Sequence, residues 1–395
     1  MKGLIFSSNF HSLFSRNSLL INQPSCLSSW TTPLLRQHVS AWVGNSAVRH
    51  SALEDRSSSL GFGSDCCVHV LLSEPLVVRV MASYLYYLLP AVGGYALTSL
   101  FFLKNPHILH KKKQTAFYCT HISHRGGCGE KIENTMEAFT HAVEMGTEML
   151  ELDCHLTKDG HVVVSHDENL LRQTGQDVNI SSLNLEELPP YNETLEVTFK
   201  TGHFSTGSDR NLVLLEDVFR KFPHIAVNIE VKENNSLLIE KISDLVKKYN
   251  REAISVWASV DSTIMENCCK TNSSMPYMFT VKRGLMLLLL YYTGLLPFVP
   301  LGESFLQFYL PQIINREYIP EMWIMRSRLV VFLIQRLTLR KGMFKHLRDR
   351  GIQIHLFVCN KEEDIKTAFA AGATGVMSDY PTLLSNYIRR HTQDT

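Results

Sequence analysis

Short apolar runs alternate with amphipathic stretches between residues 119 and 390. The runs have the length of buried strands, whereas the amphipathic stretches repeat apolar positions every three or four residues, as helices do. The predicted strands are 119–123, 149–153, 161–165, 225–231, 254–258, 277–281, 352–358 and 375–377. The predicted helices are 134–145, with Asn134 as N-cap, 214–222, 236–249, 264–270, 362–371 and 382–390. Strands that alternate with helices imply a parallel sheet, and about eight of them favour an α/β fold closed into a (β/α)8 TIM barrel.

Residues 82–103 form an apolar stretch without a single charge. At ~1.5 Å rise per residue, a helix of this length spans ~30 Å, the hydrocarbon thickness of a bilayer. Four lysines follow this stretch, at position 104 and at 111–113. A positively charged flank of this kind usually lies on the cytosolic side of a membrane. We therefore expect a membrane anchor at 81–103, a basic linker at 104–118 and a cytosolic barrel. A buried core helix is the alternative.

A second apolar segment interrupts the strand–helix rhythm late in the predicted barrel, at about 283–325. It contains 285–300, which a hydropathy window reads as a membrane span, and then 305–310. Pro297 and Pro300 limit the helix to about 13 residues, too short to cross a bilayer. A span would also leave the last barrel strands on the wrong side of the membrane. We expect an insertion that lies in the interface or lines a groove for lipid tails; a buried crossover helix and a true span are the alternatives.

Composition adds few constraints. The chain has 395 residues, enough for one large domain plus extensions, and its net charge of +1 gives no reason to expect a nucleic-acid partner. Nine cysteines without a Cys-x-x-Cys spacing predict buried, reduced thiols. Residues 1–80 contain no acidic residue before Glu54 and resemble either an organelle transit peptide or a disordered, alternatively initiated leader.

Carboxylates and cations cluster at predicted strand ends. Glu151 and Asp153 are two residues apart on one strand, so both point to the same face, and Glu230 ends another strand. Carboxylates that face a barrel interior repel each other unless a cation neutralises them, and Mg²⁺ or Ca²⁺ prefers such oxygen ligands. The alternative is a pair held by Arg125 and Lys232 without a metal.

Two histidines also follow predicted strands. His124 and His166 lie beside these carboxylates, and histidine can accept or donate a proton near neutral pH. Cleavage of a phosphodiester needs both steps. Arg125 can bind two phosphate oxygens at once, and Lys232 adds a further positive charge. His166 can equally be a metal ligand, and both roles stay open.

Six motifs resemble the glycerophosphodiester phosphodiesterase family, whose members are metal-dependent (β/α)8 barrels. They are His124-Arg125-Gly126, Glu133-Asn134-Thr135, Glu151-Leu152-Asp153, His166-Asp167, Glu230-Val231-Lys232 and Ser378-Asp379-Tyr380-Pro381. The resemblance covers about 119–390. It implies that His124 and His166 are the acid/base pair and that Arg125 and Lys232 contact phosphate. It also implies that the metal ligands are Glu151, Asp153 and Glu230, while Glu133 orients the site or a substrate hydroxyl.

The membrane segment and the apolar insertion resemble the membrane-bound lysophospholipase D subgroup of that family. This resemblance implies hydrolysis of lysophospholipids to lysophosphatidic acid and choline or an N-acylethanolamine, at endoplasmic reticulum or perinuclear membranes. We expect the bilayer and a lysophospholipid as partners and infer no protein partner. Hydrolysis of small soluble glycerophosphodiesters is one alternative, and an inactive membrane scaffold is another.

Overall fold

The structure is a computed structural model that describes residues 76–320 and 322–392. Internal contacts divide the described chain into two units, and the boundary falls within helix α2 (Leu76–Lys104), between Leu89 and Pro90. Of the predicted leader at 1–80, residues 1–75 lie outside the described residues. The unit that continues from Pro90 contains the described sheet strands.

A parallel sheet forms the centre of this unit. Its strands follow one another in the spatial order β8–β7–β2–β1–β11–β10–β9. Their bounds are β1 His121–Ser123, β2 Met149–Leu156, β7 Ala226–Val231, β8 Ser255–Ala258, β9 Phe305–Tyr309, β10 Gln353–Phe357 and β11 Gly375–Ser378. Two short strands extend the sheet beyond β2: β3 (Val162–Val164) pairs antiparallel with β2, and β6 (Val213–Leu214) pairs antiparallel with β3. A separate hairpin consists of β4 (Thr194–Glu196) and β5 (Phe204–Thr206).

The two ends of the parallel path are connected by isolated bridges. Trp257 of β8 pairs with Tyr277, and Met278 pairs with Phe305 of β9. The strand predicted at 277–281 is therefore present as two bridges rather than a ladder, and a helix already begins at Val281. The arrangement is a TIM-barrel-like α/β fold.

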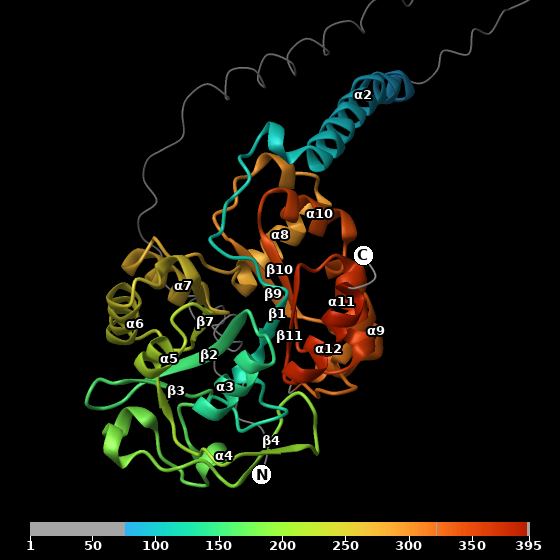
Figure 1. Cartoon of the computed structure of the whole chain (residues 1–395). Coiled ribbons are helices and arrows are strands. Elements are labelled where there is room, and N and C mark those ends of the chain that lie inside the picture. The colour runs from blue at the N-terminus through green and yellow to red at the C-terminus, as the bar shows by residue number, and fades with distance from the viewer. Residues whose placement is uncertain (1–75, 321, 393–395) are drawn as a thin grey trace, which may run out of the picture. The chain divides into compact units, whose positions relative to one another are not determined.

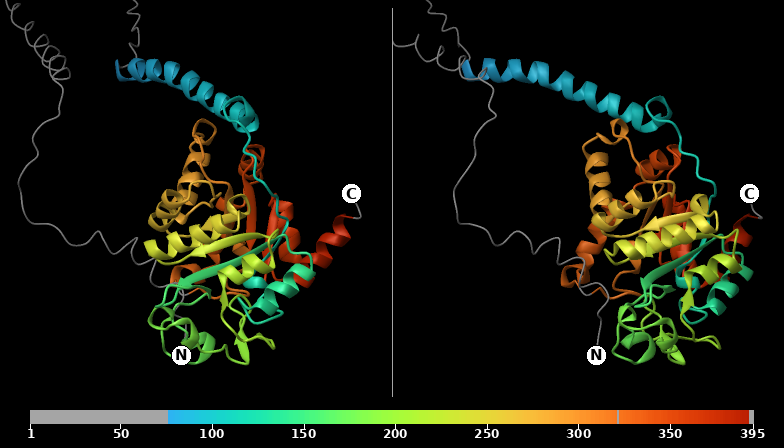
Figure 2. Two further views of the ribbon diagram at one scale, coloured as in Figure 1. Left: turned by 60° about the vertical axis from the view of Figure 1, so that its left-hand side comes forward. Right: turned by 90° about the vertical axis from the view of Figure 1, so that its left-hand side faces the viewer.

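Helices cover the outside of the strands, as the different views agree (Figures 1 and 2). They are α3 Met136–Glu144, α4 Leu171–Thr174, α5 Leu215–Lys221, α6 Ser236–Lys248, α7 Ser262–Thr271, α8 Val281–Tyr292, α9 Arg328–Thr338, α10 Lys341–Asp349, α11 Glu362–Ala371 and α12 Pro381–Thr392. On the predicted helix α6, the apolar side chains of Ile239, Ile242 and Val246 are buried. All eight residues of β2 are buried, as expected for a strand covered on both faces.

One predicted helix cap is wrong. The N-cap of α3 is Thr135, whose hydroxyl accepts a hydrogen bond from Ala138 N, and not Asn134. Asn134 instead has a left-handed backbone with a φ of 57°. Asparagine tolerates this conformation better than most residues, which is why it precedes the cap. The predicted strands at 149–153 and 161–165 form a hairpin, because β2 and β3 pair antiparallel and the turn between them contains Asp159 and Gly160.

The late apolar segment differs in part from its prediction. α8 has 12 residues and ends before Pro297, so it is as short as the prolines predicted. The residues expected to follow it within the insertion, 305–310, instead supply β9, which pairs with β10 over five residues. The five residues of β9 are apolar apart from Gln307, and so short an apolar run fits a buried strand and an insertion equally well, which explains the error.

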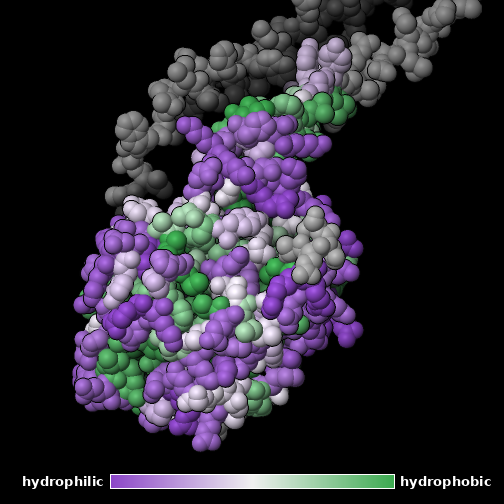
Figure 3. Space-filling view, viewed as in Figure 1, coloured by the Kyte–Doolittle hydropathy of each residue, from purple (hydrophilic) through white to green (hydrophobic). Residues whose placement is uncertain are grey.

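α2 is the helix of the described chain that is long and apolar enough to cross a membrane, over Ser83–Lys104. Apolar side chains lie at its surface (Figure 3), and only 6% of that window is buried. Its C-terminal half is fixed to the turn after α8, because the Tyr95 hydroxyl donates to Thr293 O and the Ser99 hydroxyl donates to Gly294 O, both at 2.6 Å.

Candidate active site

The loop after β1 holds the first histidine and arginine in a strained turn. Arg125 has a φ of 49°, a left-handed conformation that is unfavourable for a residue with a side chain. Its backbone N–H donates to Glu151 Oε2 at 2.8 Å, which ties the turn to β2. The following glycine, Gly126, is required because its φ is 80° and an added Cβ would lie 2.7 Å from the Phe139 ring. The turn thus aims His124 and Arg125 at the strand ends.

Three carboxylates meet where β2 and β7 lie side by side. Glu151, Asp153 and Glu230 each bring one oxygen within 4.8 Å of the others, and Asp153 is paired in register with Glu230. Burial raises the pKa of Glu151, and the negative charge of Asp153 raises it further. Burial also raises the pKa of Glu230. Excess negative charge is therefore concentrated in a buried set of oxygen ligands.

Lys232 neutralises one of these carboxylates. Its Nζ lies 2.7 Å from Asp153 Oδ1. Burial raises the pKa of Asp153, but the positive charges of Lys232, His166 and Arg125 together outweigh burial and lower it. Neither Glu151 nor Glu230 has a lysine or arginine side chain paired with it among the described ion pairs, and the nearest imidazole nitrogen to Glu151, His124 Nε2, lies 4.0 Å away. A hard divalent cation fits these oxygens. This group of three does not include His166.

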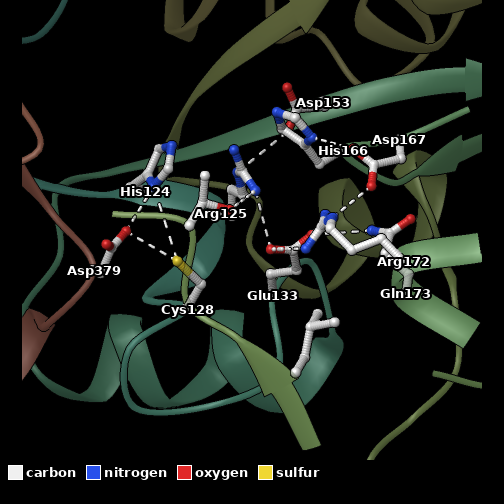
Figure 4. A network of polar contacts seen from close by, with 12 residues as sticks. His124, Arg125, Cys128, Glu133, Asp153, His166, Asp167, Arg172, Gln173 and Asp379 are labelled. Carbon is white, nitrogen blue, oxygen red and sulfur yellow. Dashed lines mark hydrogen bonds and ion pairs between the residues drawn. The ribbon is translucent and has the colours of Figure 1, made fainter. Parts of the chain in front are cut away.

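Each histidine donates a hydrogen bond to an aspartate. His124 Nδ1 lies 2.6 Å from Asp379 Oδ1, and His166 Nδ1 lies 2.6 Å from Asp167 Oδ1 (Figure 4). An aspartate on Nδ1 leaves Nε2 as the nitrogen that can exchange protons with a substrate. His124 Nε2 points toward the carboxylates, 4.0 Å from Glu151 Oε2.

The two aspartates are themselves held in place. Asp379 accepts further hydrogen bonds from Cys128 Sγ at 2.9 Å and from Asn360 Nδ2 at 2.7 Å. Asp167 accepts one from Arg172 Nε at 2.6 Å. None of Cys128, Asn360 or Arg172 was predicted as a site residue, and the role of Asp379 as partner of His124 was not predicted either.

Glu133 forms the centre of a buried network (Figure 4). Arg125 Nη1 donates to Glu133 Oε2 at 3.0 Å, whereas Gln173 Nε2, at 3.0 Å, and Arg172 Nη2 donate to Oε1. Burial raises the pKa of Glu133, but Arg172 and then Arg125 outweigh burial and lower it strongly. The carboxylate therefore stays charged and orients Arg125, in line with the predicted orienting role.

Arg125 keeps one buried donor for an anion. Its Nη1 is used by Glu133, whereas its Nε has no hydrogen-bond partner in the described structure and lies 4.0 Å from Asp153 Oδ2. An unpaired buried N–H is costly and indicates a missing acceptor. An anionic oxygen bound beside the carboxylates would supply one.

The predicted site residues thus lie together in one place. His124, Arg125, Glu133, Glu151 and Asp153 are all buried. His166 and Lys232 belong to the same cluster, because Lys232 Nζ donates to His166 O at 3.4 Å. A cavity of about 250 Å³ opens at His124, Glu151 and Glu230.

Comparisons with known proteins agree with this geometry. The model of the glycerophosphoryl diester phosphodiesterase family matches residues 124–383. Human lysophospholipase D GDPD1 is 50% identical over 303 residues, which cover 77% of this chain and 96% of that protein. Human lysophospholipase D GDPD3 is 47% identical over 311 residues, which cover 79% and 98%.

A solved structure shares the fold. The crystal structure of the glycerophosphoryl diester phosphodiesterase domain of a Mycobacterium tuberculosis protein superposes with a TM-score of 0.52 and 15% identity. The match covers 69% of this chain and 100% of that domain. At this identity the likeness concerns the fold alone.

Proposed function

The chain belongs to the glycerophosphoryl diester phosphodiesterase family, and we propose that it is a lysophospholipase D that works at a membrane surface. It is a phosphodiesterase enzyme. The head-group ester of a lysophospholipid is hydrolysed to lysophosphatidic acid and the free alcohol, either choline or an N-acylethanolamine. The names of the two human relatives support the substrate class.

The observation that carries the proposal is the buried cluster of Glu151, Asp153 and Glu230 beside an unpaired N–H of Arg125. We assign the three carboxylates as ligands of a divalent metal, Mg²⁺ or Ca²⁺. When bound, the metal supplies positive charge that polarises a phosphoryl oxygen. His166 is left to act on protons, since it lies outside this group of three.

The chain's own residues then divide the remaining work. Arg125 binds a phosphate oxygen through the free Nε–H, and Glu133 holds the guanidinium in position. One of His124 and His166 removes a proton from water as its oxygen bonds to phosphorus. The other donates a proton to the head-group oxygen as its bond to phosphorus breaks. Lys232 adds a positive charge near the phosphate.

The surroundings fit a membrane enzyme. We propose that Ser83–Lys104 of α2 spans the bilayer, with the lysine flank favouring a cytosolic barrel. We also propose that the segment at Tyr277 and Met278 completes a closed (β/α)8 barrel between β8 and β9, which the two isolated bridges support.

The test is metal-dependent release of choline from lysophosphatidylcholine by the purified full-length chain in mixed micelles. Mg²⁺, Ca²⁺ and a chelator are compared, with glycerophosphocholine as a second substrate. We expect metal-dependent turnover of lysophosphatidylcholine and its loss in His124→Ala.

Two outcomes would contradict the proposal. Turnover of glycerophosphocholine alone would identify an enzyme for soluble diesters. Absence of turnover on every phosphodiester, with a folded protein, would favour an inactive scaffold.

A further inference from the structure

We infer that the acyl chain of the substrate leaves the active site through the barrel wall next to β9 and lies along α8, where Gly284 sets the length of chain that fits. This inference rests on the proposed lysophospholipase D function. It assigns a residue that controls specificity, far along the chain from the catalytic motifs.

The cavity that opens at the catalytic residues also reaches α8. Its inner end is lined by His124, Glu151 and Glu230, and its outer part by α8 and by Met343 of α10. Apart from those three, no lining side chain carries a charge. One end therefore suits a phosphate with its metal, and the other suits a hydrocarbon chain.

The lining residues come from both faces of strand β9. Gln307 points across the barrel interior, because its Nε2 donates to Asn228 Oδ1 on β7 at 3.3 Å. The neighbouring Leu306 and Phe308 point the opposite way, and the Phe308 ring lies 6.1 Å from that of Phe344 on α10. Leu306, Gln307 and Phe308 all line the same cavity. A cavity that touches both faces of a strand passes from the interior to the outside of the barrel.

Strand pairing is short on one side of β9. β9 pairs with β10 over five residues on one side, whereas on the other side the backbone pairing with 277–279 is confined to Ser304 and Phe305. The segment then turns directly into α8, whose start is fixed by an ion pair between Arg283 and Glu303 and by the Thr280 cap. The passage is thus a stable part of the fold, framed by a rigid helix on its outer side.

The size and polarity of the cavity select a single hydrocarbon chain. Its volume is about 250 Å³, whereas about 150 Å³ of apolar cavity is enough to bind benzene. Leu285 lines the cavity and is also 64% exposed, so the outer end opens at the protein surface. A glycerophosphodiester without an acyl chain has no group to fill this space. A lysophospholipid has one such chain, attached to the phosphate that the inner end binds.

Gly284 lies in the middle of the helix face that lines the passage. Val281, Gly284 and Leu288 follow the three- and four-residue spacing of one helical face, and all three line the cavity. A Cβ added at Gly284 would meet no atom within 4 Å, and its backbone is helical. A larger side chain therefore fits the helix and takes up the space of the acyl chain.

The test is the series Gly284→Ala, Gly284→Leu and Gly284→Phe in the full-length protein. Hydrolysis of hexanoyl- and palmitoyl-lysophosphatidylcholine is compared in identical mixed micelles. We expect the ratio of kcat/KM for palmitoyl over hexanoyl substrate to fall with side-chain size, by at least about tenfold for Gly284→Phe. The matched control is Leu289→Phe on the same helix, which is exposed and does not line the cavity; it should leave the ratio unchanged.

A second measurement does not depend on turnover. Lysophosphatidylcholine with a diazirine at the end of its acyl chain is bound to His124→Ala, irradiated, and the labelled peptides are identified by mass spectrometry. We expect labels on α8 and α10, and their loss in the double variant with Gly284→Phe. Labels confined to α2 would overturn the inference.

The outcomes separate the two proposals. If the wild type hydrolyses only glycerophosphocholine, the proposed function fails. The acyl passage fails and the function stands in two other cases, both with a wild type that hydrolyses palmitoyl-lysophosphatidylcholine. In the first, the Gly284 series lowers kcat/KM equally for the palmitoyl and hexanoyl substrates. In the second, Leu289→Phe changes the ratio as much as Gly284→Phe does.

Discussion

His124 and His166 each have an aspartate as partner, but their electrostatic surroundings are opposite. Each donates a 2.6 Å hydrogen bond from Nδ1 to an aspartate. Burial lowers the pKa of both. For His124 the Asp379 carboxylate outweighs burial, and the net shift is upward. For His166 the charges of Arg125 and Lys232 add to burial, and its pKa lies well below the ordinary value.

The difference shows that the site has two sides. The His124 side is rich in carboxylates, with Glu151 and Asp379 close by, whereas the His166 side is rich in cations. The same side chain therefore favours its protonated form on one side and its neutral form on the other. A pair of proton-exchanging groups with separated pKa values is what acid/base catalysis on a phosphodiester requires.

Removal of metal gives the largest expected effect and tests the carboxylate-rich side. Chelation should lower turnover by at least about a thousandfold, because the metal supplies several kcal/mol of charge stabilisation. Adding Mg²⁺ or Ca²⁺ should also raise the melting temperature, since a bound cation relieves repulsion among the buried carboxylates.

The control separates this site from general ion effects. Glu151→Gln should abolish the metal-induced rise in melting temperature, whereas Glu240→Gln, at an exposed carboxylate on α6, should retain it. Equal shifts in both variants would refute the assignment of the carboxylate cluster as a metal site.

Replacement of either histidine should have the next largest effect. His124→Ala and His166→Ala should each lower kcat by about a hundredfold to ten-thousandfold, the range for loss of a general acid or base. His161→Ala, in the exposed β2–β3 hairpin, is the matched control and should keep wild-type activity. If only one of the two replacements reduced activity, the site would not contain an acid/base pair.

Much of this site follows from the sequence because of how a barrel is built. The carboxyl ends of parallel strands meet on one face, so residues at predicted strand ends converge whatever their separation in the chain. Glu151 and Glu230 come together in this way across 79 positions, as the paired strands β2 and β7 place them. The helix and strand pattern was sufficient for this prediction.

Other parts of the site depend on packing that no local pattern encodes. Asp379 belongs to one of the motifs that carry the family resemblance, but its bond to His124 joins residues 255 positions apart. Arg172 lies on the four-residue helix α4, too short for any periodicity. β9 was assigned to the insertion because a short, mostly apolar run fits several structures. These features require three-dimensional contacts to be identified.

The aspartates distinguish the two sides more finely. Asp379→Asn removes the charge that raises the pKa of His124, so this pKa should fall. The limb of the pH–rate profile that follows His124 should then move to lower pH by about one unit. Asp167→Asn should lower kcat without this displacement, since the main charges that act on His166 are those of Arg125 and Lys232.

The measurement is the full pH profile of kcat/KM for both variants beside the wild type. Identical displacement in both would mean that the two sides do not differ electrostatically. No displacement in Asp379→Asn would remove Asp379 as the cause of the raised pKa.

The smallest effect is expected at Arg172, which connects the two sides without contacting substrate. Its guanidinium donates to Asp167, the partner of His166, and to Glu133, the partner of Arg125. Arg172→Gln should lower kcat/KM by about tenfold, because small displacements of positioned groups are costly in rate. Arg172→Lys should recover little of the lost kcat/KM, since an ammonium group cannot donate in two fixed directions as the guanidinium does.

A purely structural role for Arg172 would give a different result. The metal-induced rise in melting temperature should be preserved in Arg172→Gln, because the residue touches none of the three carboxylates. A variant that lost this rise together with activity would show that Arg172 supports the fold of the whole site. The expected pattern, reduced turnover with intact metal binding, instead places its effect on the alignment of His166 with Arg125, where the two sides of the site meet.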